Sequence, residues 1–168
     1  MGVAVAFELD GEFVGTVRAV PLGHGLTLLE ELREQAGIVP DSTYHNGWEM
    51  GRLIISPTWR GGRDSLRAFL YLSLTFLEQM RPVDHLHATC TPALARLYRG
   101  FGFENVARDV PLPGTDKTYT LIHGAFTDVI DKLSGSHNAL PPVLADRIPP
   151  YPMAQAMAYA GASHEHLH

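Results

Sequence analysis

The chain has 168 residues, 45% of them hydrophobic, and its formal net charge is −5 at pH 7. That length and apolar content support one domain with a substantial core and leave too little chain for two. The acidic balance argues against a nucleic-acid partner, and no apolar run reaches the ~20 residues of a membrane span. A single cysteine, Cys90, excludes an intramolecular disulfide and is typical of a reducing compartment, so we expect a cytoplasmic protein.

The elements alternate between strand-like and helix-like patterns. The chain opens with two β-rich runs around Asp10-Gly11, a pair typical of a two-residue hairpin turn. In chain order, the patterns predict strands at 3–9 and 12–20, a helix at 26–35, a strand at 48–56, a helix at about 65–80, a strand at 83–89, a helix at 92–98, strands at 103–110 and 117–123, and a helix at 126–133. This order favours a mixed sheet covered by helices over a bundle or a sandwich.

Residues 134–168 differ from the rest of the chain, because prolines interrupt them repeatedly. We predict a domain over residues 1–133 and an extended, proline-rich arm over 134–168. The arm keeps apolar side chains, so we expect it to pack on its own domain. A swapped arm in a homodimer is the alternative.

The most informative stretch is an apolar strand that runs through an Arg/Gly turn into the helix at 65–80. The turn contains Gly61 and Gly62, and Asp64 or Ser65 is expected to cap the helix. Free backbone N–H groups and the positive helix end then point at one place, where an anion binds well. Seven arginines oppose three acids between residues 52 and 99, which also favours a phosphate-bearing ligand. A plain glycine-rich turn and a solvated basic surface are the alternatives.

Two segments carry a family resemblance. The segment 52–66 resembles the acyl-donor motif of the GNAT superfamily of N-acetyltransferases, a strand followed by a Pro-x-aromatic-Arg-Gly turn and a helix. The segment 94–103 resembles the second signature of that superfamily, a Leu-Tyr helix that leads through Gly-Phe into a strand. The resemblance implies an α/β (α+β) fold with one mixed, mostly antiparallel sheet, splayed central strands and flanking helices. It also implies that the donor is held by Ile54, Ile55, Ser56, Arg60, Gly61, Gly62, Arg63, Asp64 and Ser65.

A narrower resemblance comes from Glu49-x-x-Arg52. This pair is similar to the pattern of the autoinducer synthase and long-chain N-acyl amino acid synthase branch, whose members transfer a fatty acyl group to an amine. The resemblance implies an acyl-CoA or acyl-phosphopantetheine donor, acyl carrier protein as a partner, a small amine acceptor such as an amino acid, and no metal. The chain departs from the pattern at Arg63 and Ser65, where the turn normally has small residues. It also shows no counterpart before Val3 for the first strand and the following helices of the superfamily. Either the chain begins late, or the helix at 26–35 and the C-terminal arm replace that wall.

Acyl transfer to an amine needs a base, a polarised carbonyl and a proton for the leaving thiolate. Glu49 is the candidate base or amine-orienting group, with Arg52 as its partner. Positions 49 and 52 face opposite sides of a regular strand, so a bulge is needed to bring them together. A structural Glu–Arg contact is the alternative. Tyr98 is the candidate acid, and an aromatic side chain packed at a helix end is the alternative reading.

The histidines suggest a metal less strongly than they suggest other roles. His164, His166 and His168 alternate near the C-terminus, where zinc or nickel would bind adventitiously, and His85 and His87 are expected to border the donor cleft. The sequence therefore predicts an N-acyltransferase that uses a pantetheine thioester. The apolar helix at 65–80 favours a medium or long acyl chain. An acetyl-CoA-dependent acetyltransferase of a small amine or protein and a catalytically idle GNAT-fold binding protein are the alternatives.

Overall fold

The computed structural model describes residues 2–9, 11–134 and 157–158. Through residue 134 the helices and strands follow the predicted order, and their ends differ from the prediction by no more than two residues. The elements are β1 (Val3–Leu9), β2 (Glu12–Pro21), α1 (Leu28–Gln35), β3 (Gly47–Ile55), α2 (Arg63–Met80), β4 (His85–Cys90), α3 (Pro92–Arg99), β5 (Glu104–Pro111), β6 (Thr118–Ala125), α4 (Phe126–Ser134) and β7 (Met157–Ala158). Two short 3-10 turns, η1 (Ser42–Tyr44) and η2 (Pro57–Trp59), precede and follow β3.

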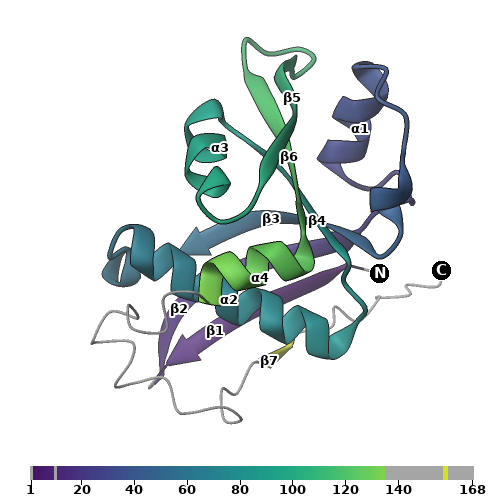
Figure 1. Ribbon diagram of the computed structural model, residues 1–168. Coiled ribbons are helices and arrows are strands. Elements are labelled where there is room, and N and C mark those ends of the chain that lie inside the picture. The colour runs from purple at the N-terminus through teal and green to yellow at the C-terminus, as the bar shows by residue number, and fades with distance from the viewer. Residues whose placement is uncertain (1, 10, 135–156, 159–168) are drawn as a thin grey trace, which may run out of the picture.

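One mixed sheet organises the fold (Figure 1). Its strand order is β5-β6-β4-β3-β2-β1-β7, and neighbouring strands are antiparallel except for β3 and β4, which are parallel. The hairpin predicted at Asp10-Gly11 joins β1 to β2, and Gly11 has the positive φ of 79° that such a turn needs. The predicted mixed, mostly antiparallel sheet is confirmed.

Helices cover the two faces of the sheet unequally. Alternate residues of β6 show this, because Ile122 packs in the core with α2, α3 and α4, whereas its neighbour Leu121 packs with α1. The larger core includes Leu74 and Leu77 of α2 and Phe101, which is fully buried. We call the two faces the α2 side and the α1 side. The predicted burial of α2 on several sides is confirmed in part by its seven buried residues.

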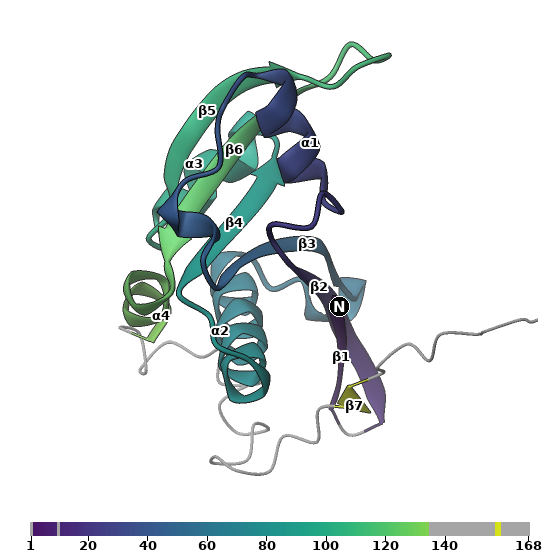
Figure 2. The ribbon, with the colours of Figure 1, turned by 90° about the vertical axis from the view of Figure 1, so that its right-hand side faces the viewer.

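The two central strands separate soon after they meet. Pairing of β3 with β4 joins only Gly47–Glu49 to His85–His87. Beyond these residues, β3 continues beside β2 and β4 continues beside β6, and Figure 2 shows the two strands turning away from each other. The expected splay of the central strands is therefore present, and it begins directly after Glu49.

A β-bulge lies in β3 just beyond that point. Gly51 pairs with Arg18 of β2 and Ile54 pairs with Thr16, so β3 has one more residue than β2 between these two pairs. Arg52 takes up the extra length in the left-handed region, with a φ of 49°. Because such a φ is costly for an arginine, the surrounding structure must hold it there, which is common at functional sites.

Two predictions need comment at the ends of elements. The N-cap predicted at Asp64 or Ser65 is wrong: α2 begins at Arg63, and Gly62 is the N-cap with a φ of 88° and no side-chain cap. Glycine occupies this position because a φ near 88° is strained for residues with a side chain. Apart from Ser134 and β7, which pairs with β1, the proposed arm at 134–168 lies outside the described residues. Among the described helices, none is long and apolar enough to cross a membrane.

Candidate functional site

Two cavities lie at the place where β3 leaves β4. The larger, of about 430 Å³, lies on the α2 side and is called here the α2-side cavity. The smaller, of about 260 Å³, lies on the α1 side beside the start of α1 and is called the α1-side cavity. Both are lined by Gly51, Arg52 and Thr89, so the two cavities meet across the gap between the strands.

The α1-side cavity contains the predicted base. Glu49 lines it, and the backbone N–H of Leu29, in the first turn of α1, donates a hydrogen bond of 3.1 Å to Glu49 Oε2. Burial raises the pKa of Glu49 above its usual 4.5, although hydrogen bonds from Thr27 and Leu29 and the charge of Arg18 act in the opposite direction. A carboxylate with a raised pKa is a better proton acceptor than an exposed one.

The wall of this cavity is held by a second carboxylate. Glu30 accepts hydrogen bonds from the five backbone N–H groups of residues 23–27, at 2.7 to 3.2 Å. Thr27 caps α1 and forms a reciprocal capping box with Glu30. These bonds lower the pKa of Glu30. The segment between β2 and α1 is therefore fixed by its own backbone, and it places Thr27 and Leu28 against Glu49.

Two arginines line the same cavity. Arg18 pairs with Gly51 across β2 and β3, so the two residues share the α1 face of the sheet. Arg52 enters from the bulge, and both arginine side chains are exposed at the cavity. The bulge does bring Arg52 to the cavity of Glu49, as the motif requires. The ion pairs of the described residues, however, join Arg33 to Asp41 and His123 to Glu104, and not Glu49 to Arg52.

The α2-side cavity is mainly apolar and contains the predicted acid. Its lining includes leucines 53, 66, 70, 74 and 94 together with Tyr98. Burial raises the pKa of Tyr98 to about 12, with a smaller contribution from Cys90. The Tyr98 ring packs edge-on against Phe101 and Phe103. The ring of Tyr98 is thus packed at the end of α3, and its side chain also lines the α2-side cavity.

The predicted donor-binding turn begins at the end of β3. Ile55 O accepts a hydrogen bond of 2.8 Å from Arg60 Nε, and Ser56 N bonds to Val14 O at the same distance. Ile54 is 54% exposed. The turn therefore continues directly from the sheet and is fixed to it at its first residues.

At the start of α2 the turn leaves backbone donors without a side-chain cap. Gly61 packs closely against the buried Ser65, Gly62 is the N-cap, and Asp64 is exposed in the first turn. The first N–H groups of a helix have no partner within the helix. Arg63 is directed elsewhere, because its guanidinium lies over the ring of Phe101 at 5.4 Å and beside Gly100. Its aliphatic and planar groups thus support the loop after α3.

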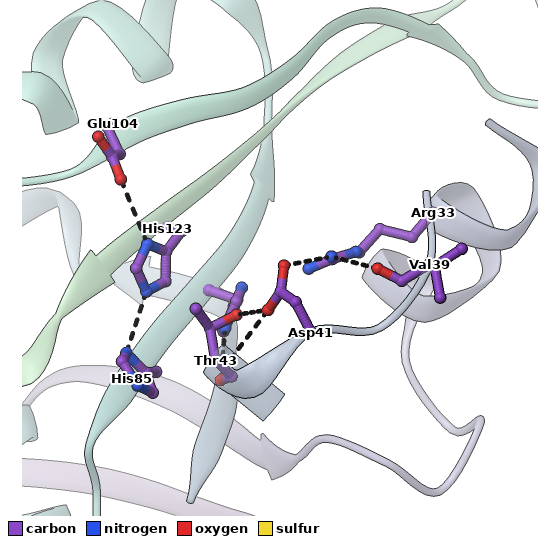
Figure 3. A network of polar contacts seen from close by, with 8 residues as sticks. Arg33, Val39, Asp41, Thr43, His85, Glu104 and His123 are labelled. Atoms are coloured by element: carbon purple, nitrogen blue, oxygen red, sulfur yellow. Dashed lines mark hydrogen bonds and ion pairs between the residues drawn. The ribbon is translucent and has the colours of Figure 1, made fainter. Parts of the chain in front are cut away.

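The histidines form a separate group on the α1 side of β4 and β6. Figure 3 shows His123 between His85, with ring nitrogens 3.1 Å apart, and Glu104, at 3.6 Å. His87 Nε2 donates to the carbonyl oxygen of Thr43 at 3.1 Å, and burial lowers the pKa of His87 to about 4. Among the described residues, no group of three or more His, Cys, Asp or Glu could hold a metal ion. His164, His166 and His168 lie outside them.

The fold is that of the GNAT-type acyltransferases. Solved structures of CoA-dependent acyl-homoserine lactone synthases share the fold: MesI has a TM-score of 0.57 at 18% identity, over 80% of this chain and 69% of that one. BjaI, with SAM and isopentyl-CoA, gives 0.57 at 18% over 80% and 63%, and the synthase LasI gives 0.55 at 15% over 75% and 66%. Comparison with curated proteins finds no match. A family model, "N-acyl amino acid synthase FeeM", matches residues 2–124. The chain belongs to this family of acyltransferases.

The structure brings together some predicted residues and adds others. Glu49 lines one cavity, Tyr98 lines the other and Arg52 lines both, whereas neither lining includes the predicted donor-binding residues 54–56 and 60–65. Sequence analysis missed Arg18 and Gly51. The signal for Arg18 was present, because it is the one charged residue in the apolar run Thr16–Val20.

Proposed function

We propose that this chain transfers an acyl group from a pantetheine thioester, carried by coenzyme A or acyl carrier protein, to the amine of an amino acid. The observation that carries the proposal is the meeting of the two cavities at Gly51, Arg52 and Thr89. Glu49 lines one cavity and Tyr98 lines the other. An amine and a thioester that enter from opposite sides of the sheet would thus meet between a base and a phenol.

The donor is proposed to enter along the free edge of β3. Beyond Glu49, β3 has no partner among the described strands on the side of β4. The amide groups of a pantetheine arm can pair with such an edge, and the uncapped start of α2 provides N–H groups for its phosphate. The acyl chain would then lie among the leucines of the α2-side cavity. Ile54, Ile55, Ser56 and the backbone of the turn at 60–65 keep their predicted donor-binding role in this scheme, whereas the Arg63 side chain lies against Phe101 and Gly100.

The acceptor reacts as a free amine. The amine nitrogen attacks the thioester carbon, the C–N bond forms, Glu49 takes the proton that the nitrogen then loses, and the C–S bond breaks to release the thiolate. The raised pKa of Glu49 brings the carboxyl closer to the operating pH, where proton transfer is most effective. Arg52 is proposed to act beside Glu49 rather than as its ion-pair partner.

The role of Tyr98 follows from its environment. A phenol with a pKa of about 12 stays protonated at neutral pH, and it is less acidic than a thiol of pKa about 8.5. Full transfer of its proton to the thiolate is therefore unfavourable. We propose instead that the Tyr98 hydroxyl donates a hydrogen bond to the sulfur as negative charge develops there.

The test is a matrix of donors and acceptors. Acetyl-CoA, a long-chain acyl-CoA and a long-chain acyl carrier protein are each incubated with the twenty amino acids, and amide products are measured by mass spectrometry. The proposal expects N-acyl amino acids from the long-chain donors. Turnover with acetyl-CoA alone would overturn the choice of donor, and donor binding without any product would overturn the enzymatic proposal. The cytoplasmic location and the homodimer stay predictions.

A further inference from the structure

We propose that Arg18 and Arg52 together bind the carboxylate of the acceptor and so make this site specific for amines that carry a carboxylate. The inference rests on the proposed function and adds a specificity-determining pair to it. Arg18 was not among the expected site residues, and Arg52 was expected only as a partner of Glu49.

The α1-side cavity is lined by more positive than negative side chains. Three ionisable side chains line the α1-side cavity: Arg18, Arg52 and Glu49. The lining thus holds two guanidinium groups and one carboxyl group, so its positive groups outnumber its negative group even when Glu49 is ionised. Glu30 also acts on Glu49 electrostatically, but its carboxylate accepts the five backbone N–H groups of residues 23–27. The cavity therefore has an excess of positive charge and suits an anionic ligand.

The guanidinium groups of Arg18 and Arg52 are available to a ligand. Among the ion pairs of the described residues, neither Arg18 nor Arg52 has a carboxylate partner within 4.0 Å. Arg33, by contrast, is buried and bonded to Asp41 at 3.0 Å and to Val39 O at 3.0 Å. An arginine with a fork of free N–H donors beside a cavity matches the planar geometry of a carboxylate.

The space beside Gly51 can hold a small ligand. Arg18 lies directly opposite Gly51, and a Cβ built on Gly51 would meet nothing within 4 Å. The cavity thus occupies the place of the missing side chain, with Arg18 on the neighbouring strand, Arg52 in the bulge and Glu49 two residues before Gly51. Its volume of about 260 Å³ lies below the usual 300–1,000 Å³ of drug-sized pockets, so it suits a small acceptor.

Both the carboxylate and the amine of an amino acid find partners in this cavity. An α-amino acid carries its amine and its carboxylate on the same carbon. With the carboxylate at the two guanidinium groups, the amine lies beside Gly51, where Glu49 can accept its proton. The strained φ of Arg52 has a role here, because the bulge directs this side chain to the cavity of Glu49 instead of continuing the regular alternation.

The experiment compares acids with their amides. For the best amino acid found in the donor and acceptor matrix, kcat and KM are measured with long-chain acyl-CoA for that amino acid and for its primary amide. The wild type is expected to prefer the acid. Arg18→Met and Arg52→Asn are expected to raise KM for the acid roughly 10- to 100-fold and to raise KM for the amide much less. Asparagine is chosen at position 52 because it tolerates a left-handed φ, and Arg18→Lys should recover part of the preference.

The matched control is Arg81→Met, which removes an exposed arginine at the far end of α2. This variant should leave KM for the acid and KM for the amide as they are in the wild type. Equal losses for acid and amide in the Arg18 and Arg52 variants, or a rise in the donor KM instead of the acceptor KM, would overturn the carboxylate-binding role.

A binding measurement separates this inference from the proposed function. Calorimetric titration of the twenty amino acids and of the matching amides into the wild type and the Arg18 variant needs no turnover. Amino acid binding that is lost in the Arg18 variant supports the carboxylate-binding role of the two arginines even if no acyl transfer is found. Acyl transfer with no preference for acids over amides, or no binding of any amino acid, contradicts that role.

Discussion

The two faces of the sheet differ in chemistry although the same strands build them. The α1 side carries Glu49, Arg18 and the histidines, whereas the α2 side presents leucines and aromatic rings. The alternation of side chains along a strand makes this separation possible, and the gap between β3 and β4 is where the faces communicate. A polar acceptor and an apolar acyl chain could therefore approach one reaction centre without sharing a pocket.

The strongest test of this comparison removes the base from the α1 side. Glu49→Gln is expected to lower kcat/KM for acyl transfer by roughly 100-fold or more, a typical contribution of a general base. In the wild type, activity should fall as the pH drops through the pKa of Glu49, which lies above 4.5. Steady-state rates from pH 4.5 to 9 measure both effects, and the variant should lose this limb of the profile.

Stability distinguishes a catalytic role of Glu49 from a structural one. Because its pKa is raised in the folded state, the ionised carboxylate opposes folding above about pH 4.5. Glu49→Gln should therefore unfold at no lower temperature than the wild type at pH 7. A variant that loses activity and melts many degrees lower would indicate that Glu49 mainly orders β3 and α1.

The polar face should also make the fold sensitive to acid. His87 is 1% exposed and has a pKa of about 4, below the usual 6.5. The unfolded chain takes up this proton first, so stability is lost as the pH falls from 6.5 towards 4, by about 2–3 kcal/mol at pH 4.5. His87→Gln should reduce the loss, as measured by chemical denaturation at pH 7.5 and pH 4.5. The exposed His24, changed to glutamine, is the control, and an equal acid sensitivity in both variants would contradict this assignment.

The apolar face is tested by filling its cavity. Leu66→Trp is expected to lower kcat/KM for a long-chain acyl donor roughly tenfold to thirtyfold while sparing a short-chain donor, because the larger ring occupies space that the acyl chain would fill. Leu66→Met keeps the volume and is the control. If short and long donors lose rate equally, the acyl chain does not lie on the α2 side.

The smallest expected effect is at Tyr98. Tyr98→Phe keeps the ring that packs against Phe101 and Phe103 but removes the hydroxyl. The loss of one hydrogen bond to a developing thiolate should lower kcat about tenfold and leave the melting temperature nearly unchanged. If the rate constant of acyl transfer in a single turnover is also unchanged, Tyr98 has a packing role alone.

Much of the fold was predictable because its signals are local. Hydrophobic spacing placed the elements through residue 134 within two residues of their observed ends, and the Asp10-Gly11 pair indicated the opening hairpin. The start of α2 was less predictable. A side-chain cap was expected at Asp64 or Ser65, but the left-handed backbone at Gly62 begins the helix earlier. Backbone conformation, and not side-chain capping chemistry, decides this end.

The site was predictable in part, at residues that belong to short sequence patterns. Glu49, Arg52 and Tyr98 belong to short sequence patterns, and the structure places all three at the cavities. Arg18 comes from another strand, and it becomes a neighbour of Gly51 only through the register of β2 and β3. The Glu49-x-x-Arg52 pair indicated a bulge in β3, but no sequence pattern showed which residue of β2 would lie opposite it. Finding Arg18 therefore needed the structure.

The carboxylate of Glu30 has a consequence for the time course of binding. It holds residues 23–27 through their own N–H groups, so this segment of the wall beside Glu49 is fixed before any substrate arrives. Because these residues do not have to become ordered when the acceptor enters, little of their conformational entropy is lost at that step. We expect the acceptor to pass this segment at a rate set by diffusion and electrostatic attraction rather than by the closing of residues 23–27.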